Sequence, residues 1–168
     1  MKIAIGQRIP DVTLFRLGGS GIETVRTGEL CAGRRVALFG VPGAFTPTCS
    51  NEHLPGYVAR AAELHGSGVD LIACVAVNDP YVMAAWGEAQ GAGDRIEMLA
   101  DAAAELTRAL GLERDLSSIG LGLRCRRFAA LLEDGVFRHV AVEPGPGVTV
   151  CGATNLLYAI SASAIGER

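Results

Sequence analysis

A cysteine that follows a buried strand is the residue of this chain best suited to chemistry. The apolar run 36–39 predicts a strand, and it leads into the nine residues VPGAFTPTC, which end at Cys49. Thr46 is a favourable N-cap, and Pro47 then falls at the first helical position, where its missing N–H costs nothing. The pattern predicts Cys49 in the first turn of a helix, beside unpaired N–H donors and the positive end of the helix dipole. This position favours the thiolate, which is the reactive form of cysteine.

The start of a helix is not enough by itself to keep a thiol ionised at neutral pH. Lowering the pKa of a cysteine from ~8.5 to ~6 requires about 3.4 kcal/mol, at ~1.36 kcal/mol per unit. A helix terminus supplies at most about 2 kcal/mol. A nearby cation is therefore expected. The chain offers Arg124, Arg126 and Arg127 directly ahead of a predicted strand that begins near Phe128.

The segment around Cys49 resembles the peroxidatic-cysteine motif of the peroxiredoxins. Residues 42–50 read PGAFTPTCS, and with HLPG at 53–56 they are similar to the type II subfamily, which includes the peroxiredoxin-five group. Further agreement in VNDP, LAD and RRF, at 77–80, 99–101 and 126–128, extends the likeness over nearly the whole chain. The resemblance implies a thiol-dependent peroxidase that reduces hydrogen peroxide and alkyl hydroperoxides through a cysteine sulfenic acid, in antioxidant defence and redox homeostasis.

The resemblance also assigns roles to four residues. The family's active-site arginine immediately precedes such a phenylalanine, so the role falls on Arg127, whose fixed donors suit both a sulfur and a peroxide oxygen. The Thr46 hydroxyl would bridge the Cys49 thiolate and the peroxide, and Pro42 would shield the site from water. Plainer interpretations are a surface ion pair for Arg127 and a helix cap for Thr46. His53 lies four residues after Cys49 on the same helix face, and it would either tune the site or serve as a hydrogen-bonded structural histidine.

The sequence does not decide which thiol reduces the sulfenic acid. A thiol converts a sulfenic acid to a disulfide. Cys74 matches a second cysteine of plant-like type II peroxiredoxins, but it lies in an apolar strand, where an inert core thiol is the usual outcome. Cys151 approximates the resolving cysteine of animal peroxiredoxin-five proteins. Our preferred hypothesis is an external thiol, glutathione with glutaredoxin, and thioredoxin is the other candidate. Cys31 is predicted to be a core residue, and Cys125 matches no role.

Two other functions use the same cysteine. One is a peroxide sensor whose oxidised Cys49 signals to a partner protein. The other is a thiol-disulfide oxidoreductase, which the absence of a Cys-x-x-Cys pair disfavours. The five cysteines are an odd number, which also argues against a secreted disulfide scaffold and a zinc ribbon, so we expect no metal and no cofactor.

Composition bounds the partners and the location. The 168 residues predict one domain, 1–168, and the net charge of −3 gives no reason to expect nucleic acid or an anionic membrane. The apolar stretch at the N-terminus is too short for a cleavable signal, so a cytoplasmic location is expected. The mean hydropathy is high at +0.31. Residues 144–166 are uncharged, which predicts a loop with a buried helix or a surface covered by a second subunit, and the resemblance implies a homodimer.

The order of strand and helix patterns predicts an α/β sandwich with a mixed central sheet. We expect a hairpin over 10–26, a helical turn at 27–33, strands at 35–40, 70–77 and 96–99, a helix from Pro47 to about His65, helices after Asp79 and at 102–110, a hairpin over 127–142 and a last helix at 152–163. Pro55 should kink the first long helix after Asn51. The resemblance to peroxiredoxins implies that this α/β architecture is the thioredoxin-like fold.

Overall fold

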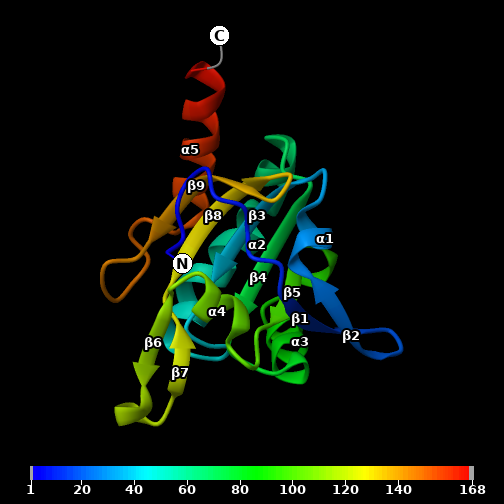
Figure 1. The fold of residues 1–168 in the computed structure, drawn as a ribbon, viewed down its shortest axis with the longest axis vertical. Coiled ribbons are helices and arrows are strands. Elements are labelled where there is room, and N and C mark those ends of the chain that lie inside the picture. Colours follow the sequence, from blue (N-terminus) through cyan, green and yellow to red (C-terminus); the bar gives the residue numbers. More distant parts are fainter. Residues whose placement is uncertain (1, 167–168) are drawn as a thin grey trace.

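The structure is a computed structural model that describes residues 2–166 (Figure 1). Its strands are β1 (Thr13–Gly18), β2 (Gly21–Arg26), β3 (Arg35–Gly40), β4 (Leu71–Ala76), β5 (Glu97–Ala100), β6 (Glu113–Leu116), β7 (Gly122–Cys125), β8 (Phe128–Glu133) and β9 (Val136–Val142). Its α-helices are α1 (Thr27–Cys31), α2 (Leu54–Gly66), α3 (Pro80–Ala89), α4 (Glu105–Ala109) and α5 (Ala153–Gly166). A π-helical turn, Cys49–His53, precedes α2, and short 3-10 turns lie at Gly93–Arg95 and Ser117–Ile119.

Seven of the strands within residues 2–166 form one mixed sheet in the order β2-β1-β5-β4-β3-β8-β9. Strands β5, β4 and β3 run parallel, and the remaining neighbours are antiparallel. The strands β6 and β7 form a separate antiparallel ribbon. The predicted α/β architecture, its mixed central sheet and its N-terminal hairpin are therefore confirmed.

The sheet separates two apolar cores. Side chains of a strand alternate between the two faces, so successive residues of β3 enter different cores. Ala37 and Phe39 pack with α2, α3 and α5, whereas Val36 and Leu38 pack with α1, α4 and the N-terminal segment. Strands β4 and β8 alternate in the same way. Covering both faces with helices explains why the central strands are apolar throughout.

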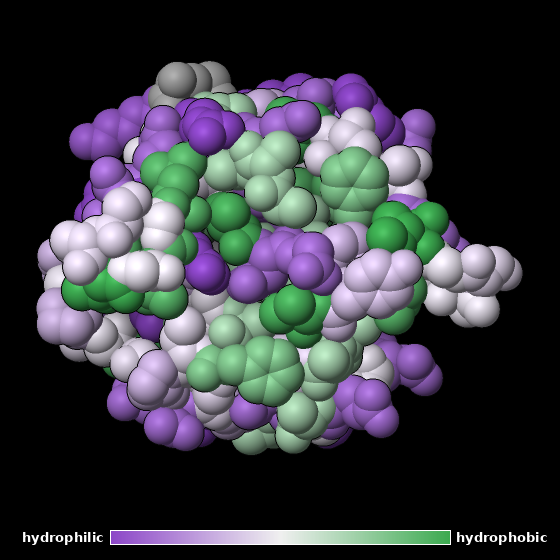
Figure 2. Space-filling model, turned by 90° about the horizontal axis from the view of Figure 1, so that it is seen from below, coloured by the Kyte–Doolittle hydropathy of each residue, from purple (hydrophilic) through white to green (hydrophobic). Residues whose placement is uncertain are grey.

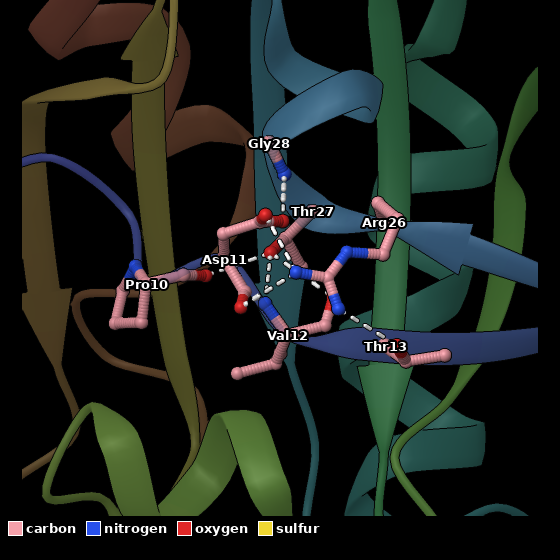
Figure 3. A network of polar contacts seen from close by, with 7 residues as sticks. All are labelled: Pro10, Asp11, Val12, Thr13, Arg26, Thr27 and Gly28. Atoms are coloured by element: carbon pink, nitrogen blue, oxygen red, sulfur yellow. Dashed lines mark hydrogen bonds and ion pairs between the residues drawn. The ribbon is translucent and has the colours of Figure 1, made fainter.

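A polar network fixes the join between the N-terminal hairpin and α1 (Figure 3). The Asp11 carboxylate accepts from the Gly28 N–H at 3.1 Å and pairs with Arg26 at 2.6 Å. The buried Thr27 hydroxyl donates to the Pro10 carbonyl at 2.7 Å and accepts from the Val12 N–H at 2.9 Å. Asp11 therefore supplies the N-terminal cap that α1 lacks in its own sequence.

Two sequence expectations need correction, and one element was missed. The β6–β7 ribbon was not predicted, because the polar residues 113–115 show no alternation with apolar ones. The helix expected at 102–110 is only Glu105–Ala109, since Ala104 takes a left-handed φ of 56° and the Asp101 carboxylate accepts from two N–H groups of the first turn. Pro55 does not bend a continuous α-helix. The preceding turn widens instead, and the Leu54 N–H donates to the Cys49 carbonyl in the π-helical manner.

No helix among residues 2–166 is long and apolar enough to cross a membrane. The last helix, α5, buries only the face that carries Ala153, Leu156 and Ile160. The uncharged stretch predicted a loop with a buried helix. The loop and the helix are present, but most residues of α5 are exposed.

Candidate active site

The topology gathers the candidate residues at one edge of the sheet. Strand β3 ends at Gly40 and leads to Cys49, and Gly40 lies opposite Phe128, the first residue of the antiparallel strand β8. Arg127, which precedes Phe128, therefore reaches the same edge. Gly40 is required here because an added Cβ would lie 2.1 Å from the Phe128 ring.

Cys49 and Arg127 are in direct contact. The Arg127 Nη2 donates to the Cys49 sulfur at 3.3 Å, and the two side chains lie on elements 78 residues apart in the sequence. Cys49 is 1% exposed and Arg127 is 7% exposed. The cation that the charge argument required is therefore next to the sulfur, and the interpretation of Arg127 as a surface ion pair is wrong.

His53 holds the other end of the guanidinium. The Arg127 Nη1 lies 3.0 Å from the His53 Nδ1, and the His53 Nε2 lies 3.0 Å from the Cys151 carbonyl oxygen. A guanidinium only donates and a carbonyl only accepts, so His53 is the neutral tautomer with its proton on Nε2. Burial lowers the pKa of His53 to about 4, and the charge of Arg127 acts in the same direction. His53 is thus a hydrogen-bonded buried histidine that also contacts Arg127. The two alternatives from the sequence, a structural histidine and a neighbour of the site, therefore do not exclude each other.

Tyr57 supports the same carbonyl from the next turn of α2. Its hydroxyl donates to the Cys151 carbonyl at 3.0 Å, and its ring stacks on Phe39 with centroids 3.9 Å apart. Burial raises the pKa of the Tyr57 hydroxyl well above its usual value, so the hydroxyl keeps the proton that it donates. Two side chains of the helix thereby fix one carbonyl of the loop before α5.

Thr46 does not cap the helix. Its hydroxyl donates to the Gly43 carbonyl at 2.7 Å, and the π-helical turn that follows, whose N-cap is Thr48, has no side-chain cap either. The reason is the tight turn 43–46, in which the Gly43 carbonyl also receives the Thr46 N–H and Phe45 takes a left-handed φ of 62°. Asn78 closes the turn from the β4 side, since its Oδ1 accepts from the Ala44 N–H at 2.9 Å. Pro47 begins the helix, as predicted.

Glu143 organises the loop between β9 and α5. Its Oε1 accepts from the N–H groups of Thr149, Val150 and Cys151 at 2.7, 2.7 and 2.9 Å, and its Oε2 accepts from the Thr149 hydroxyl at 2.7 Å. Burial raises the pKa of this carboxyl, but the four hydrogen bonds outweigh burial and hold the pKa at about 2. A permanent carboxylate therefore positions the loop whose Cys151 carbonyl holds His53.

A cavity of about 370 Å³ reaches Arg127, the residue that donates to the Cys49 sulfur. Its lining consists of Pro42, Thr48, Arg114, Arg126, Arg127 and residues 143–147. Arg127 is buried and Arg114 is exposed, so these two arginines mark its inner and outer ends. Figure 2 views the molecule from this end and shows a hydrophilic centre with hydrophobic residues around it. The cavity gives a small molecule a path to Arg127, and Pro42 occupies the place expected of a residue that shields the site.

The other four cysteines are buried, free thiols. Cys74 lies in the middle of β4. Burial is the main cause that raises its pKa well above the usual value, and the nearby Cys49 adds a smaller effect in the same direction. Burial, with a smaller effect of the Glu143 charge, raises the pKa of Cys151 to about 12. The Cys151 thiol donates to the Ala141 carbonyl at 3.2 Å. Burial likewise raises the pKa of Cys31 to about 11 and that of Cys125 to about 12. Cys31 is a core residue, as predicted.

Sequence reasoning missed Glu143, Tyr57 and Asn78. The bonds of these residues are mostly to backbone groups that only the tertiary fold brings near, and nothing in the immediate sequence of Glu143 or Tyr57 marks them. Asn78 stands in the VNDP segment that carried the resemblance, which was the one available signal. Within residues 2–166, no three His, Cys, Asp or Glu side chains gather in a way that would hold a metal ion.

A buried cysteine beside an arginine, on a helix that follows a sheet strand, defines the peroxide-reducing thiol enzymes of the thioredoxin-like fold. The Redoxin family model matches residues 4–157. Peroxiredoxin-2E-2, chloroplastic, of Oryza sativa subsp. japonica is 51% identical over 163 residues, which are 94% of this chain and 72% of the rice protein. The chain belongs to the peroxiredoxin family and fits its type II subfamily.

Solved structures of peroxiredoxins superpose on this chain over nearly its whole length. Reduced Prx3 of Vibrio vulnificus in complex with hydrogen peroxide superposes with a TM-score of 0.91 at 49% identity, covering 94% of this chain and 99% of that one. Peroxiredoxin 5 of Alvinella pompejana superposes with a TM-score of 0.85 at 38% identity, covering 95% and 99%. The chain is a thiol-dependent peroxidase with the thioredoxin-like fold.

Proposed function

We propose that Cys49 is the peroxidatic residue of this peroxidase and that Arg127, Thr46 and Pro42 form its catalytic surroundings. The observation that carries the proposal is the 3.3 Å contact between the Arg127 guanidinium and the Cys49 sulfur inside a nearly closed site. In the reaction, the Cys49 thiolate attacks one peroxide oxygen, the O–O bond breaks, and the second oxygen leaves with a proton as water or an alcohol. Cys49 is oxidised to a sulfenic acid, and the peroxide is reduced by two electrons.

Each neighbour has one task in this step. The Arg127 guanidinium stabilises the negative charge that moves from the sulfur to the departing oxygen. The Thr46 proton is committed to the Gly43 carbonyl, so the Thr46 oxygen accepts a hydrogen bond from the peroxide O–H. Cys49 lies in the first turn of the helical segment that begins at Pro47, where N–H groups lack intrahelical partners, so the Cys49 N–H is the proposed donor to the attacked oxygen. Pro42 keeps water from the sulfur and has no N–H to hydrate.

Intact mass measured after one equivalent of hydrogen peroxide tests this assignment. The wild type should gain one oxygen, or the mass of a dimedone adduct when that sulfenic-acid trap is present. The Cys49→Ser variant should gain neither. Oxygen uptake by Cys49→Ser equal to that of the wild type, or a first oxidation at another cysteine, would overturn the assignment.

We propose that an external thiol, glutathione with glutaredoxin, reduces the sulfenic acid. The two internal candidates, Cys74 and Cys151, are fully buried, and burial raises the pKa of both thiols, so neither is a nucleophile in this conformation. Peroxidase assays with separate glutaredoxin and thioredoxin systems decide the matter. Turnover with thioredoxin alone, lost on Cys74→Ser or Cys151→Ser, would reject the proposal.

A homodimer formed through the active-site end is the proposed assembly. Four large apolar residues at this end of the molecule are each between 38% and 67% exposed: Phe45 and Val150 in loops, Tyr81 in the first turn of α3 and Ile119 in a 3-10 turn. Sedimentation should give a dimer that Ile119→Asp with Tyr81→Asp converts to a monomer. Ile165→Asp, at the far end of α5, is the matched control because Ile165 is also exposed.

We also propose a reducing compartment, the cytoplasm, as the location. The five free thiols of the chain are compatible with such a compartment. The rice relative and an Arabidopsis thaliana relative are named chloroplastic, so the alternative location to test is the chloroplast. Fractionation of the source cells followed by detection of the native chain distinguishes the two.

A further inference from the structure

The β6–β7 ribbon breaks a rule of strand pairing beside the active site. Arg114 of β6 lies directly opposite Arg124 of β7. Like charges in this arrangement destabilise an antiparallel pair. Arg126 follows two residues after Arg124, and its N–H continues the pairing by donating to the Leu112 carbonyl at 2.7 Å, so three arginines share one face of the ribbon. A local conflict of this kind is expected where function requires it.

No acidic side chain of residues 2–166 lies within ion-pair distance of these three arginines. The neighbouring acids Glu113 and Asp115 alternate with Arg114 and so belong to the opposite face of the ribbon. The Glu143 carboxylate reaches the cavity wall, but its oxygens are engaged by four donors of its own loop. These neutral donors do not cancel the charge of Glu143, but one carboxylate faces three arginines in the cavity lining, Arg114, Arg126 and Arg127, so the lining keeps a net positive charge.

The three arginines are not equally available. Arg124 is occupied, since its Nε donates to the Leu121 carbonyl at 2.7 Å and its Nη1 to the Pro42 carbonyl at 3.4 Å. It also lies against Gly43, where an added Cβ would be 2.6 Å from its Nη1. Arg126 makes one side-chain bond, from Nη2 to the Glu143 carbonyl at 3.3 Å, and Arg114 is exposed. Arg114 and Arg126 both line the cavity that leads to Arg127.

We propose that Arg114 and Arg126 form a carboxylate-binding subsite at the mouth of the active site. The proposal rests on the peroxidase assignment of Cys49. A guanidinium holds a carboxylate through two parallel N–H donors, which makes arginine the residue suited to this recognition. The cavity volume of about 370 Å³ lies in the range of small-ligand pockets, so the ligand is a small molecule with its carboxylate at the mouth and its reacting atom near Cys49.

Two kinds of molecule carry that carboxylate to this cysteine. One is an organic hydroperoxide with an acid group, which oxidises the Cys49 thiolate and leaves as the corresponding alcohol. The other is a low-molecular-weight thiol with carboxylates, such as glutathione. Its sulfur attacks the Cys49 sulfenic acid, the S–O bond breaks, and the oxygen leaves as water while a mixed disulfide forms. Both steps place a carboxylate several bonds away from the reacting sulfur or oxygen.

Paired acid and ester probes separate the two sources. In the oxidation arm, the rate of Cys49 oxidation is measured with linoleic acid hydroperoxide and with its methyl ester, both below their micellar concentrations. In the reduction arm, pre-formed sulfenic acid is mixed with glutathione or with its diethyl ester. The readout is the acid-to-ester rate ratio of each protein, measured for the wild type, Arg114→Gln, Arg126→Gln and the double variant. Arg34→Gln is the matched control, because Arg34 is exposed and precedes β3 at the opposite edge of the sheet.

The wild type should prefer the acid in at least one arm, and the double variant should lose that preference by about fivefold to twentyfold. Higher salt should reduce the wild-type preference, because exposed charges are screened. A ratio that is the same in the wild type, the double variant and Arg34→Gln in both arms would overturn the subsite. That result differs from failure of the peroxidase assignment, in which hydrogen peroxide leaves Cys49 of the wild type unoxidised.

Discussion

At the scale of single residues, the Arg127 guanidinium is shared between a sulfur and an imidazole. One nitrogen donates to the Cys49 sulfur at 3.3 Å, and the other lies 3.0 Å from the His53 ring. A lysine at this position keeps the charge but cannot make both contacts in a fixed geometry. We expect Arg127→Lys to slow oxidation of Cys49 by hydrogen peroxide about 10²-fold to 10³-fold, the usual cost of one transition-state donor. Stopped-flow measurement gives the rate, and a loss smaller than about threefold would contradict this role.

His53 is a positioning residue in this arrangement, and its two bonds define a specific rescue. A glutamine offers an acceptor oxygen to Arg127 and a donor nitrogen to the Cys151 carbonyl, whereas a leucine of similar size offers neither. His53→Leu should lower the oxidation rate about tenfold, and His53→Gln should restore most of it. A purely structural role for His53 predicts the opposite order, because leucine is the better core residue. The test compares oxidation rates with unfolding midpoints for the two variants.

Sequence reasoning found the cysteine and the arginine but not the rest of the site. The charge argument required a cation near Cys49, and the family resemblance chose Arg127 among three arginines. The link through His53 was not predictable, because it ends on a backbone carbonyl, and any residue at position 151 presents the same group. The sequence indicates Thr46 as an N-cap because its hydroxyl could accept from first-turn N–H groups, but in the structure this hydroxyl turns back to donate to the Gly43 carbonyl.

At the scale of elements, the loop between β9 and α5 depends on one carboxylate. Glu143→Gln leaves one oxygen for the three N–H groups, but it puts an NH2 donor where the Thr149 hydroxyl donates and removes the negative charge that strengthens all four bonds. We expect the free energy of unfolding to fall by about 2–3 kcal/mol. We also expect slower Cys49 oxidation, since the loop carries the Cys151 carbonyl. Urea unfolding and stopped-flow oxidation measure the two effects.

Glu133→Gln is the matched control for that change. Glu133 pairs with Arg35 and Arg138, but it is half-exposed, and surface ion pairs contribute at most about 1 kcal/mol. If Glu133→Gln destabilised the protein as much as Glu143→Gln, the loop would owe its order to general charge effects and not to this carboxylate.

The elements that could be predicted are those whose own residues carry a clear pattern. Central strands were found because they are apolar on both faces, and the β8–β9 hairpin because Asp134 and Gly135 take the positive φ values of 47° and 75° that an Asp-Gly turn favours. The β6–β7 ribbon has neither signal. Arg114 of this ribbon and Arg126, which follows β7, line a cavity that forms only when β7 lies beside the loop at Pro42.

At the scale of the whole molecule, the buried His53 couples global stability to pH. Its pKa is about 4 in the folded chain and near 6.5 when the chain is unfolded. Between these values the unfolded chain binds a proton that the folded chain does not, so the free energy of unfolding falls as the pH falls from 6.5 to 4. Glu143 acts in a lower window, because its pKa of about 2 retains stability above pH 4.5 and loses it only below. The two contributions are therefore separable by pH.

We expect urea unfolding at fixed protein concentration to show a loss of about 2–3 kcal/mol between pH 7 and pH 4.5. The same experiment on His53→Gln should show little of this loss, because glutamine does not titrate. Burial also lowers the pKa of His139, so both proteins should carry His139→Gln to remove that second contribution. If the His53→Gln protein kept the full slope, the acid sensitivity would come from another group, and the neutral His53 that accepts from Arg127 would lose its thermodynamic support.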